Sequence, residues 1–292
     1  MNLAIKLSKL NLELSKQEAL EVLKNPKHKL ENNLLIIKTK NVNWAIKQLQ
    51  KTAFSKEAYH LNKIPKKGTY KITKVKITKT PNIKEVGKIF SHLKANLKNP
   101  KHEICLIGST NTYIGLKVFE NKERFEDRKS HKRPINHPTS IDPKLARAMI
   151  NLANSNKITD PFCGAGGIII EGALINKEMT GIEISDKMLS ACKRNLEFFN
   201  LEANLVLSDA TKLSISQPIV TDIPYGKNSH KSKETTDLLN WVFKQKSKKI
   251  IICTNTPPLK KRGWTKKNSF KIYVHKSMTR YITHYHKSSI LA

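Results

Sequence analysis

Residues 157–167 read Lys-Ile-Thr-Asp-Pro-Phe-Cys-Gly-Ala-Gly-Gly, and this stretch decides the fold of the chain. It predicts a buried strand that ends in Asp160, then a glycine-rich turn, then an apolar helix. Gly164 and Gly166 allow the turn to take positive φ and to approach a ligand closely. A dinucleotide fingerprint would need a third glycine where Ile169 stands, and no Gly-Lys pair has the frame of a P-loop. The stretch therefore indicates a ligand-binding strand–turn–helix unit that is neither a dinucleotide fingerprint nor a P-loop. An ordinary tight turn is the alternative.

Acids also end three later predicted strands. Glu183, Asp209 and Asp222 each stand at such an end, and helical patterns such as residues 186–200 separate the strands. Glu183 lies 19 residues after Gly164, the offset at which a doubly wound fold places a carboxylate over ribose hydroxyls. Ligands bind at the carboxyl ends of strands in open α/β sheets. The sequence therefore predicts a C-terminal Rossmann-like α/β domain whose ligand-binding edge carries four acids.

The segment Asp222-Ile223-Pro224-Tyr225 indicates the chemistry at that edge. An exocyclic amine on a base is a poor nucleophile, because its lone pair is delocalised into the ring. The Asp222 carboxylate and a backbone carbonyl at Ile223 or Pro224 could each accept one amine hydrogen, while Pro224 stiffens the loop and Tyr225 stacks on the base. The segment resembles the Asp/Asn-Pro-Pro-Tyr/Phe signature of amino methyltransferases, from which Ile223 departs. We predict Asp222, Pro224 and Tyr225 as catalytic residues; a plain β-turn is the alternative.

The chain is strongly basic. It holds 54 Lys and Arg against 23 Asp and Glu in 292 residues, a formal net charge of +31. Residues 1–140 carry 30 basic and 11 acidic side chains, and residues 141–292 carry 24 and 12. A biased base composition of the gene would enrich lysine, but it would also favour glutamate, and acids are scarce. The imbalance predicts a polyanionic partner: nucleic acid is our expectation, and an anionic membrane surface is the alternative.

Other patterns narrow the class of protein. No apolar run approaches the length of about 18 residues that a membrane span needs, and charge interrupts the first residues too soon for a signal peptide. The four cysteines show no Cys-x-x-Cys spacing, and His284 and His286, which alternate along a predicted strand, have no zinc-like pairing with them. We expect a cytoplasmic protein that uses no metal and whose Cys163 and Cys253 are reduced and buried.

The N-terminal half predicts a basic α+β module without a glycine-rich cofactor turn. The expected strands are Leu3–Leu7, Leu34–Ile37 and Lys71–Thr78, the expected helices are Ser15–Leu23, Trp44–Tyr59 and Ile83–Leu97, and residues 104–108 and 113–118 form an expected hairpin. The first helix would open at a capping box from Ser15 to Glu18. Lys74 and Lys76 share one face of their strand and could contact phosphates; a merely solvated face is the alternative.

Several motifs together resemble one family. Phe125-Glu126-Asp127-Arg128, Lys132-Arg133-Pro134-Ile135-Asn136-His137-Pro138 and residues 143–152 resemble the junction of THUMP-domain RNA methyltransferases. With the glycine-rich turn, the Asp222–Tyr225 segment and residues 274–280, they are most similar to the archaeal tRNA guanosine-10 N2-methyltransferase family, which is S-adenosylmethionine-dependent and of class I. The resemblance covers essentially the whole chain, although before residue 100 only the pattern of elements matches.

The resemblance implies a domain organisation. Residues 1–50 would be a ferredoxin-like region, 51–122 a THUMP RNA-binding domain, 123–140 a linker and 141–292 the Rossmann-like methyltransferase domain. In that family the first two domains bind the acceptor end of tRNA, and the last holds S-adenosylmethionine.

The resemblance also implies site residues. Asp160, Gly164 and Gly166 would line the methionine part of the cofactor, Glu183 its ribose and Asp209 its adenine, and the adjoining Phe162, Ile184 and Ala210 would also contact it. Asp222 and Tyr225 would hold the target guanine. Arg128 and Arg133 would join Lys74 and Lys76 in binding RNA.

We therefore predict an S-adenosylmethionine-dependent methyltransferase that acts on the exocyclic N2 amine of a tRNA guanosine, at position 10, after the base is flipped out of its stack. The alternatives are the same chemistry at another tRNA or rRNA guanine, a DNA adenine-N6 methyltransferase, in which a THUMP-like module has no role, and a non-catalytic RNA-binding protein with a relict cofactor fold. We expect a monomer; the need for a small activator protein stays open.

Overall fold

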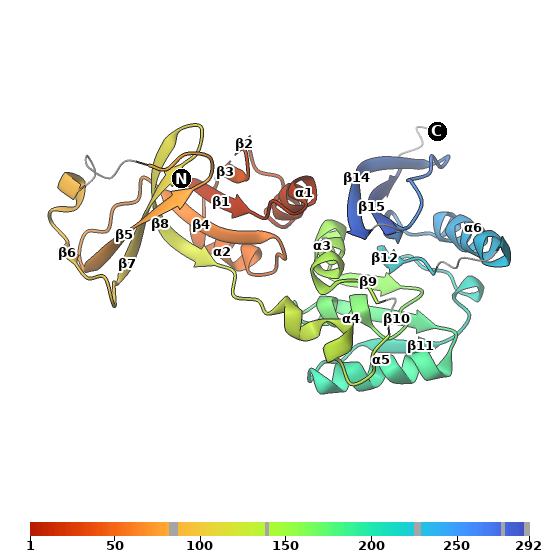
Figure 1. Cartoon of the computed structure of the whole chain (residues 1–292). Coiled ribbons are helices and arrows are strands. Elements are labelled where there is room, and N and C mark those ends of the chain that lie inside the picture. The colour runs from red at the N-terminus through yellow and green to blue at the C-terminus, as the bar shows by residue number, and fades with distance from the viewer. Residues whose placement is uncertain (82–86, 138–139, 225–228, 276–277, 289–292) are drawn as a thin grey trace. The chain divides into compact units, whose positions relative to one another are not determined.

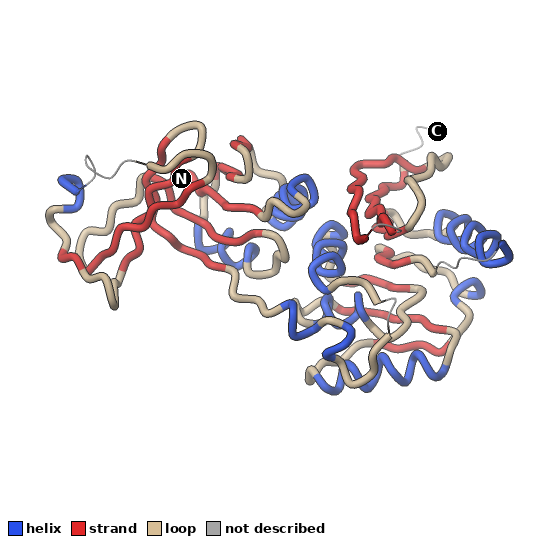
Figure 2. The backbone as a smooth tube through the Cα atoms, in the orientation of Figure 1, coloured by secondary structure: helices blue, strands red, loops and turns tan. Residues whose placement is uncertain are grey.

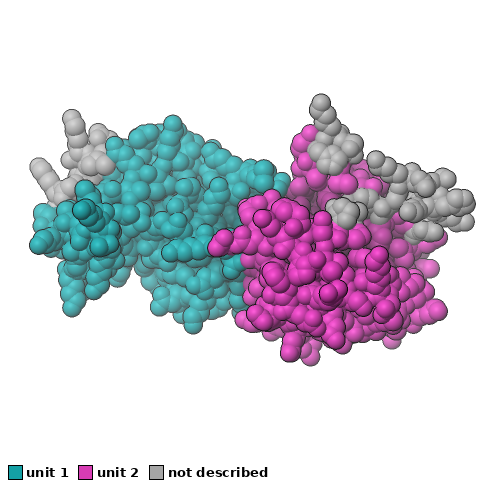
Figure 3. Space-filling model, turned by 60° about the horizontal axis from the view of Figure 1, so that its bottom comes forward, with its two compact units in different colours: residues 1–123 teal, residues 124–292 magenta. Residues whose placement is uncertain are grey.

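The chain forms two compact units, Met1–Glu123 and Arg124–Ala292, in a computed structural model that describes residues 1–81, 87–137, 140–224, 229–275 and 278–288 (Figure 1). Figure 3 colours the two units separately. Each unit has its own sheet, as the tube drawing in Figure 2 shows. We describe each unit by itself.

The first unit is α+β. Its described elements are β1 (Asn2–Leu7), α1 (Leu12–Val22), β2 (His28–Glu31), β3 (Leu34–Lys38), α2 (Val42–Leu49), β4 (Ser55–Leu61), β5 (Thr69–Lys76), the 3-10 turn η1 (Gly87–Phe90), β6 (Lys94–Ala95), β7 (His102–Gly108) and β8 (Thr112–Glu120). The strands form one sheet in the order β2-β3-β1-β4-β8-β7-β5-β6. Because β1 pairs with β4, the sheet crosses residue 50, and the division there into ferredoxin-like and THUMP domains stays a prediction.

Tertiary pairing overrides local helical pattern at two places in this unit. The predicted helix Trp44–Tyr59 is α2 followed by β4, because β4 fills the position between β1 and β8. In the predicted helix Ile83–Leu97, residues 83–86 lie outside the described part, and the rest holds only η1 and the short β6. The first helix prediction is therefore confirmed over residues 44–49 and wrong over β4, and the second is wrong over its described residues 87–97.

The predicted capping box is also wrong. Helix α1 begins three residues earlier, with Asn11 at its N-cap, so Ser15 and Glu18 lie inside the helix. Glu18 is fully buried, and its two carboxylate oxygens accept the backbone N–H groups of Ala53 (2.8 Å) and Phe54 (3.0 Å). The glutamate thus ties α1 to the loop before β4 instead of capping its own helix.

The second unit has a doubly wound α/β fold, as predicted. Its described elements are the 3-10 turns η2 (Phe125–Arg128) and η3 (Ser130–Lys132), α3 (Pro143–Ala153), β9 (Lys157–Asp160), α4 (Gly167–Ala173), β10 (Glu178–Glu183), α5 (Asp186–Phe198), β11 (Asn204–Leu207), the 3-10 turn η4 (Ala210–Lys212), β12 (Ile219–Asp222), α6 (Ser229–Lys244), β13 (Lys249–Thr254), β14 (Trp264–His275) and β15 (Met278–Lys287).

The strand order of this sheet positions the site. The order is β11-β10-β9-β12-β13-β15-β14, in which β11 to β13 are parallel and β15 runs antiparallel to β13 and β14. The chain reverses its direction of winding between β9 and β12, where ligands bind in open α/β sheets. The carboxyl ends of these two strands are Asp160 and Asp222. The fold therefore brings two of the four predicted acids to the switch point.

Candidate active site

A cavity of about 370 Å³ lies at the carboxyl ends of β9, β10 and β12. Seven of the predicted site residues line it, namely Asp160, Phe162, Gly164, Glu183, Ile184, Asp222 and Pro224. Ligand-binding pockets commonly have volumes of about 300–1,000 Å³. The cavity is therefore large enough for a small-molecule cofactor.

The glycine-rich turn is hydrogen-bonded to Glu183, the acid that ends β10. Gly164 and Gly166 have φ of +51° and +87°, and a Cβ at position 166 would lie 2.6 Å from the Cys192 sulfur. One carboxylate oxygen of Glu183 accepts the N–H of Gly164 (2.9 Å), and the other accepts the N–H of Ser185 (3.0 Å). Each carboxylate oxygen can accept a further hydrogen bond. Glu183 can therefore fix the turn and still receive two hydroxyls of a ligand.

Asp160 lines the cavity, and its side chain is almost completely buried. Its Oδ1 accepts the hydroxyl of Thr221 (2.7 Å) and the N–H of Phe162 (3.1 Å), so its described partners are neutral. Burial raises the pKa of Asp160 to about 7, against the two hydrogen bonds, which lower it. A positive charge brought into the cavity would favour the ionised form. The acid is thus suited to a cationic ligand.

Apolar side chains complete the walls. Ile184 is 70% exposed although it is a large aliphatic residue, and it lines the cavity together with Met188 from α5. Phe162 packs edge-on against Trp241 of α6, with ring centroids 5.9 Å apart. These surfaces suit the flat ring and the aliphatic chain of a nucleoside–amino acid conjugate. Acids, a glycine turn and apolar walls together fit S-adenosylmethionine.

Asp222 forms an ion pair with Arg280, which was not among the predicted site residues. Arg280 of β15 donates through Nη1 to Asp222 Oδ2 at 2.8 Å, and the two side chains are only 6% and 17% exposed. Burial raises the pKa of Asp222, while the Arg280 charge and the Cys253 thiol lower it. Arg280 stands in the sequence motif 274–280, but nothing in that motif indicates that it reaches Asp222.

The remaining predicted site residues are placed differently. Asp209 is partly exposed and caps η4, since its Oδ1 accepts the N–H (2.9 Å) and the hydroxyl (2.7 Å) of Thr211, and neither Asp209 nor the buried Ala210 lines the cavity. The carbonyl of Pro224 already accepts the hydroxyl of Thr235 at 3.0 Å, which leaves one of its lone pairs. Tyr225 lies outside the described residues.

The lysines predicted to bind RNA point to solvent. Lys74 and Lys76 are exposed on β5, and the intervening Val75 is buried. The predicted alternation of the strand is therefore present. Contact of the two lysines with RNA stays a prediction.

Two of the predicted RNA-binding residues are structural instead. Arg128 is 8% exposed and binds the buried carboxylate of Glu171 through Nε (2.7 Å), and Arg147 binds the same carboxylate from α3 (2.7 Å). Arg133 is 5% exposed and donates to the carbonyl of Arg128 (2.9 Å). Burial prevents phosphate contact by Arg128 and Arg133, so the structure corrects their assignment. The described part of the predicted linker 123–140 packs within the second unit from residue 124 onward.

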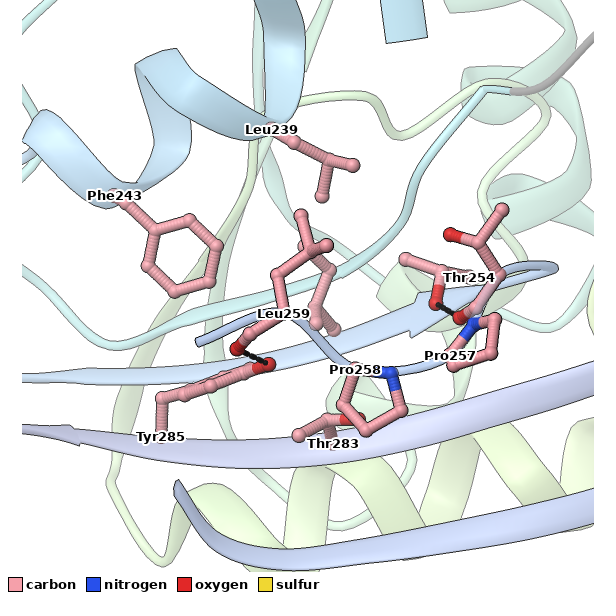
Figure 4. Close-up of a pocket in the computed structure, with 10 residues that line it drawn as sticks. Leu239, Phe243, Thr254, Pro257, Pro258, Leu259, Thr283 and Tyr285 are labelled. Carbon is pink, nitrogen blue, oxygen red and sulfur yellow. Dashed lines mark hydrogen bonds between the residues drawn. The ribbon is translucent and has the colours of Figure 1, made fainter. Parts of the chain in front are cut away.

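Other features of the second unit do not extend the cavity. A hollow of about 10 Å³ lies between α6 and the loop that follows β13 (Figure 4), where Tyr285 donates to the carbonyl of Leu259 at 2.9 Å. It has space for about one water. His284 and His286 face each other with Nε2 atoms 2.7 Å apart, and burial lowers the pKa of His284 to about 3. The pair is therefore neutral at physiological pH.

The described residues form neither a metal-type cluster nor a membrane-spanning helix. Among them, no three His, Cys, Asp or Glu side chains are grouped as metal ligands. None of the described helices is long and apolar enough to span a bilayer.

Comparison with known proteins agrees with this geometry. The family described as "RMKL-like, methyltransferase domain" matches residues 130–274. The tRNA (guanine(10)-N2)-dimethyltransferase of Pyrococcus abyssi is 34% identical over 180 residues, which cover 56% of this chain and 54% of that protein. The enzyme of the same name from Methanocaldococcus jannaschii is 32% identical over 224 residues, which cover 70% and 64%. The chain thus spans less than two thirds of the length of these relatives.

A solved structure agrees in fold. A possible methylase from Clostridium difficile 630 superposes with a TM-score of 0.51 at 14% identity, over 100% of both chains. At this identity the likeness concerns the fold alone. Residues 130–274 therefore match an RMKL-like methyltransferase domain, and the chain is similar in sequence to archaeal tRNA (guanine(10)-N2)-dimethyltransferases.

Proposed function

We propose that this chain transfers methyl groups from S-adenosylmethionine to the exocyclic N2 amine of guanosine 10 in tRNA. The observation that carries the proposal is the position of Asp222: its carboxylate lies at the switch point of the sheet and lines the same cavity as the cofactor-type residues Gly164 and Glu183. The names of the archaeal relatives support the base and its position.

S-adenosylmethionine, when bound, supplies a methyl group made electrophilic by the sulfonium. Glu183 would take the ribose hydroxyls, Ile184 would pack on the adenine, and Asp160 would face the positive charge. Asp222 would accept one hydrogen of the guanine amine and so orient the nitrogen lone pair toward the methyl carbon. Transfer would form the new N–C bond with that pair and leave the electrons of the broken S–C bond on sulfur. The nitrogen would then release one proton, which the Asp222 carboxylate would accept.

The basic N-terminal half supports tRNA as the partner. Residues 1–140 carry nearly three times as many basic as acidic side chains, and each phosphate that they neutralise releases counterions. We propose that the first unit, with Lys74 and Lys76 exposed on β5, holds the tRNA while the second unit methylates it. Its identity as a ferredoxin-like region followed by a THUMP domain, the monomeric state and a cytoplasmic location belong to this proposal.

The test is methyl transfer by the purified full-length chain. The protein is incubated with labelled S-adenosylmethionine and an unmodified tRNA transcript, and the product is digested to identify the base and its position. Label in N2-methylated guanosine at position 10 is the expected result, and a transcript with adenosine at position 10 is the control. Label at another guanine would refute the position, whereas tRNA binding without transfer by the wild-type chain would favour a non-catalytic RNA-binding protein.

A further inference from the structure

We propose that Arg280 is a positioning residue for the methyl transfer, which holds the Asp222 carboxylate in one orientation and in its charged form to receive the substrate amine. This inference rests on the proposed function. Nothing in the Asp222–Tyr225 segment predicts such a partner, since 58 residues separate Arg280 from Asp222.

The topology of the sheet creates the contact. Asp222 ends β12 and lies in register with Cys253 at the end of the parallel neighbour β13. Strand β15 runs in the opposite direction, so its beginning, with Arg280, lies at the edge of the sheet where β12 and β13 end. Arg280 Nη1 reaches past the Cys253 sulfur, 4.0 Å away, to Asp222 Oδ2 at 2.8 Å. A guanidinium can therefore approach this carboxylate only because the last hairpin is antiparallel.

The two oxygens of the Asp222 carboxylate have different surroundings. Asp222 Oδ1 is buried and has no hydrogen-bond partner within the described residues, and Asp222 lines the cavity, so we assign its contact with a ligand to Oδ2. That is the oxygen that accepts from Arg280. A carboxylate oxygen can accept two hydrogen bonds, so Arg280 can occupy one direction and leave the other for the amine. The rigid guanidinium thus fixes which direction remains.

The charged surroundings explain why this carboxylate needs a cation. The titratable groups that face Asp222 in the described residues are Arg280 on β15, the Cys253 thiol on β13 and Asp160 on β9. Burial raises the pKa of Asp222, and the charge of Arg280 is the largest influence that lowers it. A protonated Asp222 would lose one acceptor site and its charge, and it could no longer take up the amine proton. Without Arg280, burial would favour that protonated form.

Two measurements separate this role from a purely structural link between β12 and β15. The first uses full-length protein labelled with ¹³C-aspartate, without cofactor, and follows the carboxyl signal of Asp222, which is assigned by its loss in Asp222→Asn. We expect Arg280→Met to raise the Asp222 pKa by about one unit or more, and Arg280→Lys to restore most of the shift. Lys266→Met is the matched control, because it removes one exposed charge from β14 of the same hairpin. An Asp222 pKa that is equal in Arg280→Met and wild type would overturn the proposal.

The second measurement is the single-turnover rate against pH, with tRNA and saturating S-adenosylmethionine. We expect Arg280→Met to be roughly 10²-fold slower at neutral pH, with its acidic limb moved to higher pH and with part of the rate recovered there. If this variant does not fold, Arg280→Gln, which keeps a hydrogen-bond donor without charge, carries both measurements. A wild-type chain that transfers methyl groups while these variants match it in rate and pH profile would overturn the role of Arg280 alone. No transfer by the wild-type chain would overturn the proposed function instead.

Discussion

Replacing Glu183 by alanine tests how the site binds its cofactor. The carboxylate accepts two backbone N–H groups, from Gly164 and Ser185, and each of its oxygens keeps one site for a ribose hydroxyl. A hydrogen bond to a charged group contributes about 1.5–3 kcal/mol. Loss of two such bonds to the ribose costs about 3 kcal/mol at the lower bound. Since about 1.4 kcal/mol is a tenfold change in affinity, we expect binding of S-adenosylmethionine to weaken roughly 10²-fold or more.

The assay is titration calorimetry with S-adenosylmethionine, together with tRNA binding measured on the same samples. Glu178→Ala is the matched control, because Glu178 begins the same strand, is 68% exposed and forms only a surface ion pair with Lys157. We expect this control to bind the cofactor as wild type does, and both variants to bind tRNA unchanged. The cofactor affinity of Glu183→Gln should lie between those of Glu183→Ala and the wild type, because the amide nitrogen of glutamine must face one of the two N–H donors.

The outcome that would refute the reasoning is specific. If Glu183→Ala keeps the cofactor affinity of the wild type, the ribose does not bind at the end of β10. If tRNA affinity falls as much as cofactor affinity, the substitution has disturbed the unit as a whole, and the assignment of Glu183 to the cofactor loses its support.

Three further predictions concern neighbouring acids. Asp222→Ala should lower single-turnover methyl transfer roughly 10²–10³-fold, and Asp222→Asn should retain more activity because its amide oxygen still accepts one hydrogen; a rate for the alanine variant within a few-fold of wild type would contradict the role. Because burial raises the pKa of Asp160 to about 7, a cationic cofactor should bind more tightly as pH rises from 6 to 7 and level off above, and calorimetry on Asp160→Asn should show a flatter profile. Glu171→Gln should lower the free energy of unfolding by about 3–5 kcal/mol, because it leaves buried Arg128 without its carboxylate, whereas the surface change Glu178→Gln should cost less than about 1 kcal/mol in the same urea titration.

The second unit could be predicted from sequence because its signals are local. A strand, a glycine turn and a helix follow one another within residues 157–173, and the parallel strands β9, β10 and β12 are each followed by an α-helix. In the first unit the strand β4 is needed as a partner for β1 and β8, and this long-range pairing overrides the helical pattern that continues from Trp44. Local periodicity does not report such a partner, so the prediction failed there.

The same limit divides the predicted site residues. Gly164 and Glu183 lie together at the cavity, as their spacing predicted, because one helix separates two adjacent strands there. Arg128 looked like an RNA-binding residue because it stands in a charged segment, yet it is the cation of a buried ion pair with Glu171. Sequence alone does not distinguish an exposed arginine from a buried one whose carboxylate lies 43 residues away. Arg280 could not be assigned for the same reason.

Asp160 and Asp222, the two acids at the switch point, differ in the groups that surround their carboxylates. This difference suits the two substrates of the proposed methyl transfer. Asp160 has neutral described partners, the Thr221 hydroxyl and the Phe162 N–H, and its pKa is raised to about 7, so the arrival of a cation can ionise it. Asp222 has a guanidinium within 2.8 Å that belongs to the protein itself. This guanidinium favours the ionised form of Asp222 whether or not the cofactor is bound. In the proposed reaction, the acceptor for the amine is thus held by a cation of the protein itself, while the arrival of the methyl donor favours the ionisation of Asp160.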